Sequence, residues 1–137
     1  MRIVIDTNVL LQIISRRTDH YWLWQSLLRK ELTLCVTTDI LDEYHEKIVD
    51  IYNSPIFADY TLETILLMPN LVKVEKYYFW GFPFKDEDDQ KFVDCYVACG
   101  AAYLITEDKH FNELKKIPFP KVNVIRPDKF KIIFDKQ

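Results

Sequence analysis

Four acidic residues, spread over most of the chain, are placed where their carboxylates could act together: Asp6, Glu43, Asp89 and Asp108. Carboxylates brought together without cations repel one another and lose hydration, or they take up protons. Mg²⁺ or Mn²⁺, which prefer oxygen ligands, would remove that cost. Such a site supports phosphodiester hydrolysis, because one metal lowers the pKa of the attacking water and a second, if present, stabilises the leaving oxygen.

Asp6 ends the apolar run Ile3-Val-Ile5, which is too short for a helix and predicts a buried strand. A helical apolar pattern begins at Val9, so Asp6 has an alternative role as a simple helix cap. In a parallel sheet, however, the carboxyl ends of the strands face a ligand crevice. A second predicted strand ends in Thr106 and is followed closely by Asp108, which favours a shared site over a cap alone.

Glu43 belongs to a predicted helix over residues 40–52, with Asp39 as its expected N-cap. Spacing of 100° per residue gives this helix a core-facing stripe, made of Ile40, Tyr44, Ile48 and Ile51. Glu43 lies on the flank of that stripe, one turn into the helix. An exposed glutamate is the ordinary alternative, but this position favours a side chain that leans toward Asp6.

Asp89 precedes a helix whose apolar face is formed by Phe92, Val93, Tyr96, Val97 and Gly100. Extrapolation by one turn places Asp89 near the middle of this face, where a carboxylate either caps the helix or meets a cation. Asp94 lies about 130° from the centre of the face, so we expect it to point to solvent or to a neighbouring subunit. Asp94 remains the alternate third acid if the helix is rotated from this phase.

Histidines and cysteines offer little further metal chemistry in this sequence. His110 is one of three scattered histidines, and beside Lys109 it is interpreted as a surface imidazole. Cys95 and Cys99 share a helical face, but the chain has no Cys-x-x-Cys pair and an odd number of cysteines. We expect buried free thiols rather than a disulfide framework or a zinc site.

Composition predicts a single domain over residues 1–137, because 49% of the residues are hydrophobic and no repeat or low-complexity segment occurs. The longest apolar run is well short of the roughly 20 residues of a membrane span, and no signal-peptide pattern is seen, so we expect a cytoplasmic protein. A net charge of −3 requires a local basic patch for any nucleic acid. The candidates for that patch are Arg16, Arg17, Lys109, Lys115 and Lys116.

Strand-like and helix-like segments alternate along the chain. The predicted strands cover residues 2–6, 32–36, 71–75, 102–106 and 122–125, and helical patterns lie between them and after residue 127. This order indicates an α/β fold with a mainly parallel sheet covered on both faces and right-handed crossovers. The aromatic run over residues 77–84 is predicted to be a loop that covers a core edge or contacts a subunit, with base stacking as the weaker alternative.

Four segments together resemble the PIN domain nuclease family: Ile3-Val-Ile-Asp-Thr-Asn8, Glu43, Asp86-x-x-Asp89-x-x-Phe92 and Ile105-Thr-Glu-Asp-Lys-His-Phe111. The sequence is most similar to single-domain members identified as toxins of toxin–antitoxin pairs. The resemblance implies a three-layer fold with a five-stranded sheet in the order 3-2-1-4-5, and a ribonuclease dependent on Mg²⁺ or Mn²⁺.

The resemblance also implies roles for individual residues and partners. Asp6, Glu43, Asp89 and Asp108 would be metal-site acids, with Asn8 and Thr106 as supporting polar residues. RNA would be the substrate, and an antitoxin protein and a second copy of the chain would be candidate partners. An aspartyl phosphotransferase is disfavoured, because it would have a second Asp where this chain has Asn8. The main alternative is a catalytically silent PIN fold that binds RNA or protein.

Overall fold

The computed structural model describes residues 1–75, 89–118 and 120–137. Its centre is a five-stranded, all-parallel sheet in the order β3-β2-β1-β4-β5, which confirms the predicted order and direction. The strands are β1 (Arg2–Ile5), β2 (Thr33–Thr37), β3 (Leu71–Val74), β4 (Tyr103–Ile105) and β5 (Val124–Ile125). The predicted aromatic loop over residues 77–84 lies outside the described residues.

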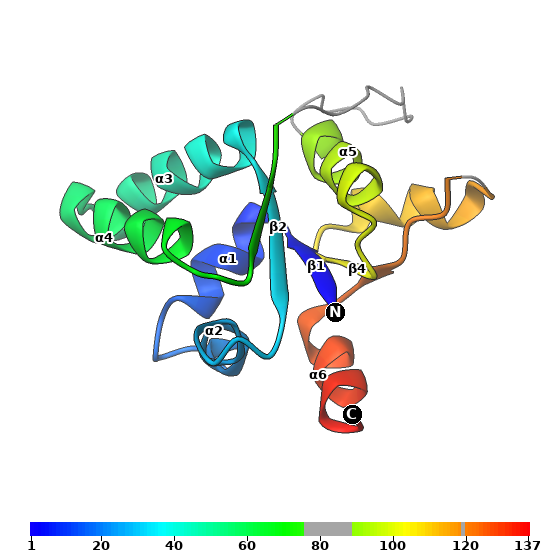
Figure 1. The fold of residues 1–137 in the computed structure, drawn as a ribbon, viewed down its shortest axis with the longest axis horizontal. Coiled ribbons are helices and arrows are strands. Elements are labelled where there is room, and N and C mark those ends of the chain that lie inside the picture. The colour runs from blue at the N-terminus through cyan, green and yellow to red at the C-terminus, as the bar shows by residue number, and fades with distance from the viewer. Residues whose placement is uncertain (76–88, 119) are drawn as a thin grey trace.

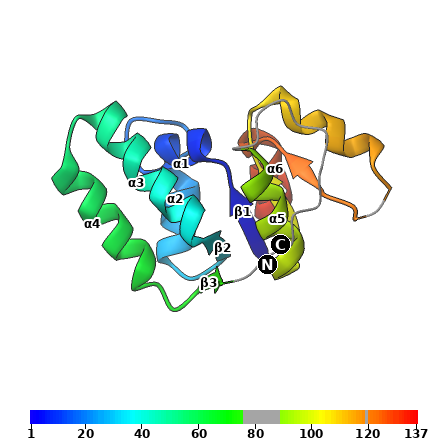
Figure 2. The same ribbon diagram turned by 90° about the horizontal axis from the view of Figure 1, so that it is seen from above.

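Helices lie on both sides of this sheet, with α1 to α4 on one side and α5 on the other (Figures 1 and 2). They are α1 (Thr7–Ile13), α2 (Tyr21–Leu28), α3 (Thr38–Tyr52), α4 (Pro55–Leu66), α5 (Gln90–Cys99) and α6 (Pro127–Asp135), with a 3₁₀ helix η2 (Lys109–Lys116). The central strands are covered on both faces, so the apolar residues of β1 and β2 are continuous rather than alternating. No helix of the described residues is both long and apolar enough to cross a membrane.

Helix α3 differs from the prediction at both of its ends. Thr37 is the N-cap rather than Asp39, because the Thr37 Oγ1 accepts a 3.2 Å hydrogen bond from the Ile40 backbone N–H. Ile51 is 66% exposed, so its assignment to the core stripe was wrong. In the last turns of α3, Val49 and Tyr52 pack inward instead, and Tyr52 contacts the ring of Phe57 on α4. The buried side of α3 therefore turns from the sheet toward α4.

Helix α5 ends at Gly100, which adopts a left-handed φ of 64° that favours glycine. This turn leads directly into β4. It therefore helps to set the position of Asp89, before α5, relative to Asp108, after β4. Cys95 and Cys99 on α5 and Cys35 on β2 are buried free thiols, as expected.

Candidate metal centre and adjoining groove

The first pair of polar residues at the site is set by strand register. Ile5 of β1 pairs with Ile105 of β4, so the next residues, Asp6 and Thr106, lie side by side. Thr106 Oγ1 donates a 2.8 Å hydrogen bond to Asp6 Oδ2. Asp6 occupies the N-cap position of α1 but makes no side-chain cap hydrogen bond, so the interpretation as a simple cap was wrong.

Burial is the main cause of an altered pKa at Asp6. The pKa of this carboxyl is raised from 3.8 to about 6, chiefly by loss of hydration; hydrogen bonds from Thr106 and the Thr7 backbone lower it, and the nearby charges of Asp108 and Glu43 add to the rise. The two acids that act on Asp6 come from α3 and from the segment after β4. A buried carboxylate held among other acids is stabilised by a cation, so these residues fit a divalent metal site.

Glu43 reaches the site from α3 and is held there by two neighbours. Thr7 Oγ1 donates a hydrogen bond to Glu43 Oε2, and Lys91 Nζ of α5 lies 2.9 Å from Glu43 Oε1. The side chain of Glu43 is 19% exposed, so it is neither a core residue nor a freely solvated one. Next to it, the buried Tyr44 hydroxyl donates to the carbonyl of Ile5, which ties α3 to the end of β1.

Asp89 and Asp108 form the other half of the site together with His110. Among the described residues, these three offer ligand atoms that all lie within 4.8 Å of one another. The backbone N–H of Asp108 donates to Thr106 Oγ1 at 3.0 Å, and Asp108 Oδ1 accepts from the His110 backbone N–H at 2.9 Å. His110 is exposed, as expected, but its Nδ1 is 3.3 Å from Asp108 Oδ1, close enough to join a metal site.

The expectation that Asp94 faces solvent was wrong. Its side chain is 1% exposed and accepts a 3.0 Å hydrogen bond from Gln90 Nε2. The phasing assumed a helix with one buried face, whereas α5 contacts β1, β2, β3, β4 and α3 and is buried on most of its surface. Asp89 rather than Asp94 lies with Asp108, and Asp89 as the third metal acid stays a prediction.

Sequence reasoning missed Thr7 and Lys91 as parts of the site. For Thr7, its place directly after Asp6 was a usable signal. Nothing local marks Lys91, because its contact with Glu43 depends on how α5 packs beside α3. Asn8, predicted as a supporting residue, is exposed at the start of α1.

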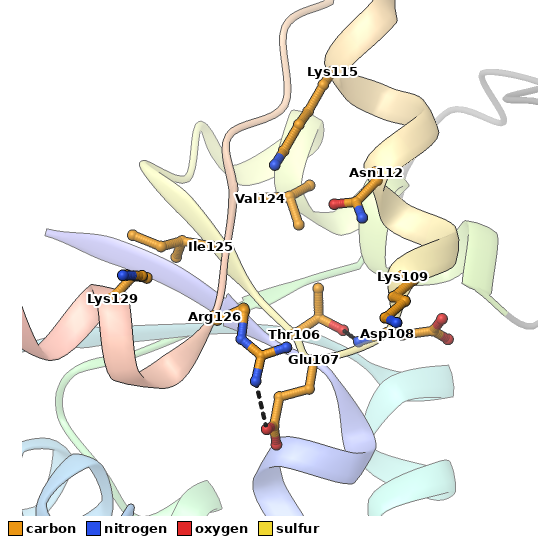
Figure 3. Close-up of a pocket in the computed structure, with 10 residues that line it drawn as sticks. All are labelled: Thr106, Glu107, Asp108, Lys109, Asn112, Lys115, Val124, Ile125, Arg126 and Lys129. Carbon is orange, nitrogen blue, oxygen red and sulfur yellow. Dashed lines mark hydrogen bonds and ion pairs between the residues drawn. The ribbon is translucent and has the colours of Figure 1, made fainter.

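A groove of about 400 Å³ adjoins Asp108 (Figure 3). One wall is η2, the other is the start of α6, and Val124 and Ile125 of β5 lie between them. The charged and amide residues of its lining are Glu107, Asp108, Lys109, Asn112, Lys115, Arg126 and Lys129. Two predicted RNA contacts, Lys109 and Lys115, therefore line the groove. The other three candidates for the patch do not line the groove: Arg16 and Arg17 are exposed in the segment after α1, and Lys116 is exposed on another face of η2.

A second feature of this region is the link between Glu107 and two other elements. Gln12 Nε2 of α1 donates to Glu107 Oε1 at 2.6 Å, and Arg126 Nη2 lies 3.6 Å from Glu107 Oε2, an ion pair drawn in Figure 3. Glu107 thus joins α1 to the residue that precedes α6 and fixes the near end of the groove.

Several solved structures share this fold. VapBC2 from Rickettsia felis, bound to a DNA fragment from its promoter, is 17% identical, with a TM-score of 0.61 over 92% of this chain and 98% of that chain. VapBC-1 from nontypeable Haemophilus influenzae is 15% identical, with a TM-score of 0.60 over 93% and 99% of the two chains. The PIN domain endonuclease Utp24 is 16% identical, with a TM-score of 0.53 over 91% and 84%. These identities are low, and the likeness therefore shows the fold alone.

Sequence comparison gives the family. No curated protein sequence matches the chain. A family model described as PIN domain matches residues 2–110, a range that holds Asp6, Glu43, Asp89 and Asp108. That match covers well over half of the sequence, and the protein belongs to the PIN domain family.

Proposed function

We propose that this protein is a metal-dependent endoribonuclease that hydrolyses phosphodiester bonds of RNA. The observation that carries the proposal is the convergence of acids from four separate elements at the carboxyl ends of β1 and β4. Asp108 and Glu43 both raise the pKa of the buried Asp6, and Asp89 lies with Asp108 within ligand distance. A cluster of this kind needs a cation, and carboxylate oxygens suit Mg²⁺ or Mn²⁺.

The residues that would hold the cation are Asp6, Glu43, Asp89 and Asp108. A bound Mg²⁺ or Mn²⁺ supplies Lewis-acid chemistry for attack of water on a phosphodiester. Thr106 orients Asp6, and its hydroxyl also receives the Asp108 backbone N–H, so it fixes two acids relative to each other. Lys91 places an ammonium group beside Glu43, where it can meet a phosphate oxygen of the substrate.

RNA as the substrate, and a role as the toxin of a toxin–antitoxin pair, follow from the sequence resemblance to PIN domain toxins. The proposed toxin role is supported by the similar fold of the solved structures of VapBC2 and VapBC-1. A protein partner is also consistent with the exposed apolar residues on and next to α4: Ile51, Ile56, Tyr60, Leu66 and Leu67. An antitoxin or a second copy of the chain would cover such a surface.

The proposal is tested by metal titration combined with RNA cleavage. We expect purified protein to bind Mn²⁺ in calorimetry and to cleave single-stranded RNA only when Mg²⁺ or Mn²⁺ is present. Asp6→Asn should remove both properties without loss of the folded circular dichroism spectrum. Metal-dependent cleavage by pure Asp6→Asn protein would reject the assignment, and RNA binding without any cleavage would favour the silent PIN fold.

A further inference from the structure

The groove beside Asp108 has a positive balance of charge in a protein that is acidic overall. Four cations line it, Lys109, Lys115, Arg126 and Lys129, against two acids, Glu107 and Asp108. The whole chain carries a formal charge of −3. Such a local reversal of sign, directly beside the metal-site acids, matches a polyanion rather than a neutral or cationic ligand.

Two of these cations, Lys109 and Lys115, are placed in one row by the geometry of η2. A 3₁₀ helix has three residues per turn, so residues three apart lie above one another on one face. Lys109, Asn112 and Lys115 form such a row and all line the groove, as Figure 3 shows. Phe111 and Leu114 form the buried row, and the third row is exposed: His110, Glu113 and Lys116.

The row of Lys109, Asn112 and Lys115 is long enough to bind a nucleic-acid backbone and has suitable side chains. Lys109 and Lys115 are separated by six residues, or about 12 Å along the helix, enough for more than one phosphate. Among residues 1–75, 89–118 and 120–137, neither forms an ion pair with a carboxylate. A second hollow of about 340 Å³ shares Lys115, Val124 and Ile125 with the first and adds Lys121. The hollowed surface therefore continues past Lys115 along β5.

We propose that this groove binds the phosphate backbone of a single RNA strand and leads it to the metal-site acids. Cations lie on both walls of the groove, with Val124 and Ile125 between them, a lining that suits the phosphates and sugars of one strand. The inference rests on the proposed nuclease function for its substrate, but its evidence is the groove itself. Asn112, in the middle of the row, adds an amide that can donate to a phosphate or a ribose hydroxyl.

The test compares two neighbouring lysines on different faces of the same helix. Lys109→Ala/Lys115→Ala removes two cations from the groove, whereas Lys116→Ala removes one from the exposed row, where it lies 3.7 Å from Glu113. Arg126 is left unchanged because it also holds Glu107. Binding of a fluorescent single-stranded RNA is measured by anisotropy in EDTA at several salt concentrations, so that no cleavage interferes.

We expect the double variant to lose about 1.4 from the slope of log K against log salt, since each single-strand phosphate contact contributes about 0.7. That loss corresponds to roughly 25-fold weaker binding at 0.1 M salt if counter-ion release supplies the contact energy. Lys116→Ala should bind like the parent. Equal slopes for the double variant and the parent would overturn the inference, and so would an effect of Lys116→Ala as large as half that of the double variant.

Cleavage assays separate this inference from the proposed function. If the enzyme cleaves RNA with Mn²⁺, the double variant should show a raised KM and a kcat near that of the parent, because Lys109 and Lys115 bind flanking phosphates. Normal cleavage with an unchanged KM would reject the groove while leaving the nuclease function intact. Salt-dependent RNA binding through the groove in a protein that cleaves nothing would keep the groove and reject the nuclease.

Discussion

At the scale of single residues, Asp6 stands out among the described acids by its raised pKa. It is buried among the strand ends, and its pKa is raised from 3.8 to about 6 mainly by loss of hydration. The folded protein therefore holds a proton on Asp6 between about pH 4 and pH 6, where the unfolded chain has released it. This difference links the stability of the metal-free protein to pH.

We predict that the free energy of unfolding of the metal-free protein falls as pH rises from about 4 to 6 and then levels off. A shift of about two pH units at about 1.4 kcal/mol per unit gives a contribution of up to about 3 kcal/mol. Asp6→Asn should remove this fall and be the more stable protein at pH 7. Urea denaturation in EDTA at several pH values measures it, with the exposed Asp42→Asn on α3 as control. The same pH dependence in parent and Asp6→Asn would contradict the assignment.

Asp89 and Asp94 give a second prediction, because the structure places them in different surroundings. A carboxylate oxygen of Asp89 lies within 4.8 Å of one of Asp108, whereas Asp94 is buried and hydrogen-bonded to Gln90. Asp89→Asn should weaken Mn²⁺ binding at least tenfold and reduce cleavage by orders of magnitude. Asp94→Asn should keep Mn²⁺ binding and change stability by about 1–3 kcal/mol, as expected for a buried hydrogen-bonded group.

Calorimetry with Mn²⁺ and thermal unfolding of both variants distinguish these outcomes. Loss of Mn²⁺ binding in a well-folded Asp94→Asn protein would show that Asp94, not Asp89, is the third acid. Helix phase led the sequence analysis to favour Asp89, which the structure places near Asp108, but it misjudged the surroundings of Asp94. The angular position of a residue on a helix gives the direction of its side chain. It does not tell how many other elements surround that helix.

At the scale of elements, the sequence was sufficient where an apolar run was continuous. Apolar runs located the five strands, and the polar residues after β1 and β4 indicated the candidate site. What it could not supply were contacts between elements. The pairing of Lys91 on α5 with Glu43 on α3, and the choice of Thr37 as N-cap, depend on neighbours in space or on competition between adjacent capping residues.

The Lys91–Glu43 contact between α5 and α3 yields a third prediction. The ammonium lies 2.9 Å from a carboxylate oxygen that would also bind the metal, so it opposes a second cation there. Lys91→Met should raise Mn²⁺ affinity by roughly three- to tenfold and lower kcat, since a positive charge near the phosphate is lost. Lys47→Met, exposed on α3, is the matched control. A fall in Mn²⁺ affinity would mean instead that Lys91 is needed to hold Glu43 in position.

At the scale of the whole molecule, the strand order determines where the acids meet. β1 has β2 on one side and β4 on the other, so chain leaving the carboxyl end of β1 and chain leaving β4 enter the same region. This is the position at which open parallel sheets bind their ligands. The order itself could be anticipated only through the family resemblance, because alternation of strands and helices permits several orders.

The last prediction follows from the distance along the chain between the four acids of the candidate site. Asp6 follows β1, Glu43 lies on α3, and Asp89 and Asp108 precede α5 and η2. An ion bound by all four therefore binds the folded state and not the unfolded chain. Mn²⁺ at about 100 times its Kd should then stabilise the whole domain by about 2.7 kcal/mol. For a chain of this size, that raises Tm by roughly 8–10 °C. Differential scanning calorimetry with and without Mn²⁺ measures the rise, which should vanish in Asp6→Asn and persist in Lys116→Ala. A rise of equal size in Asp6→Asn would place the ion away from the four acids.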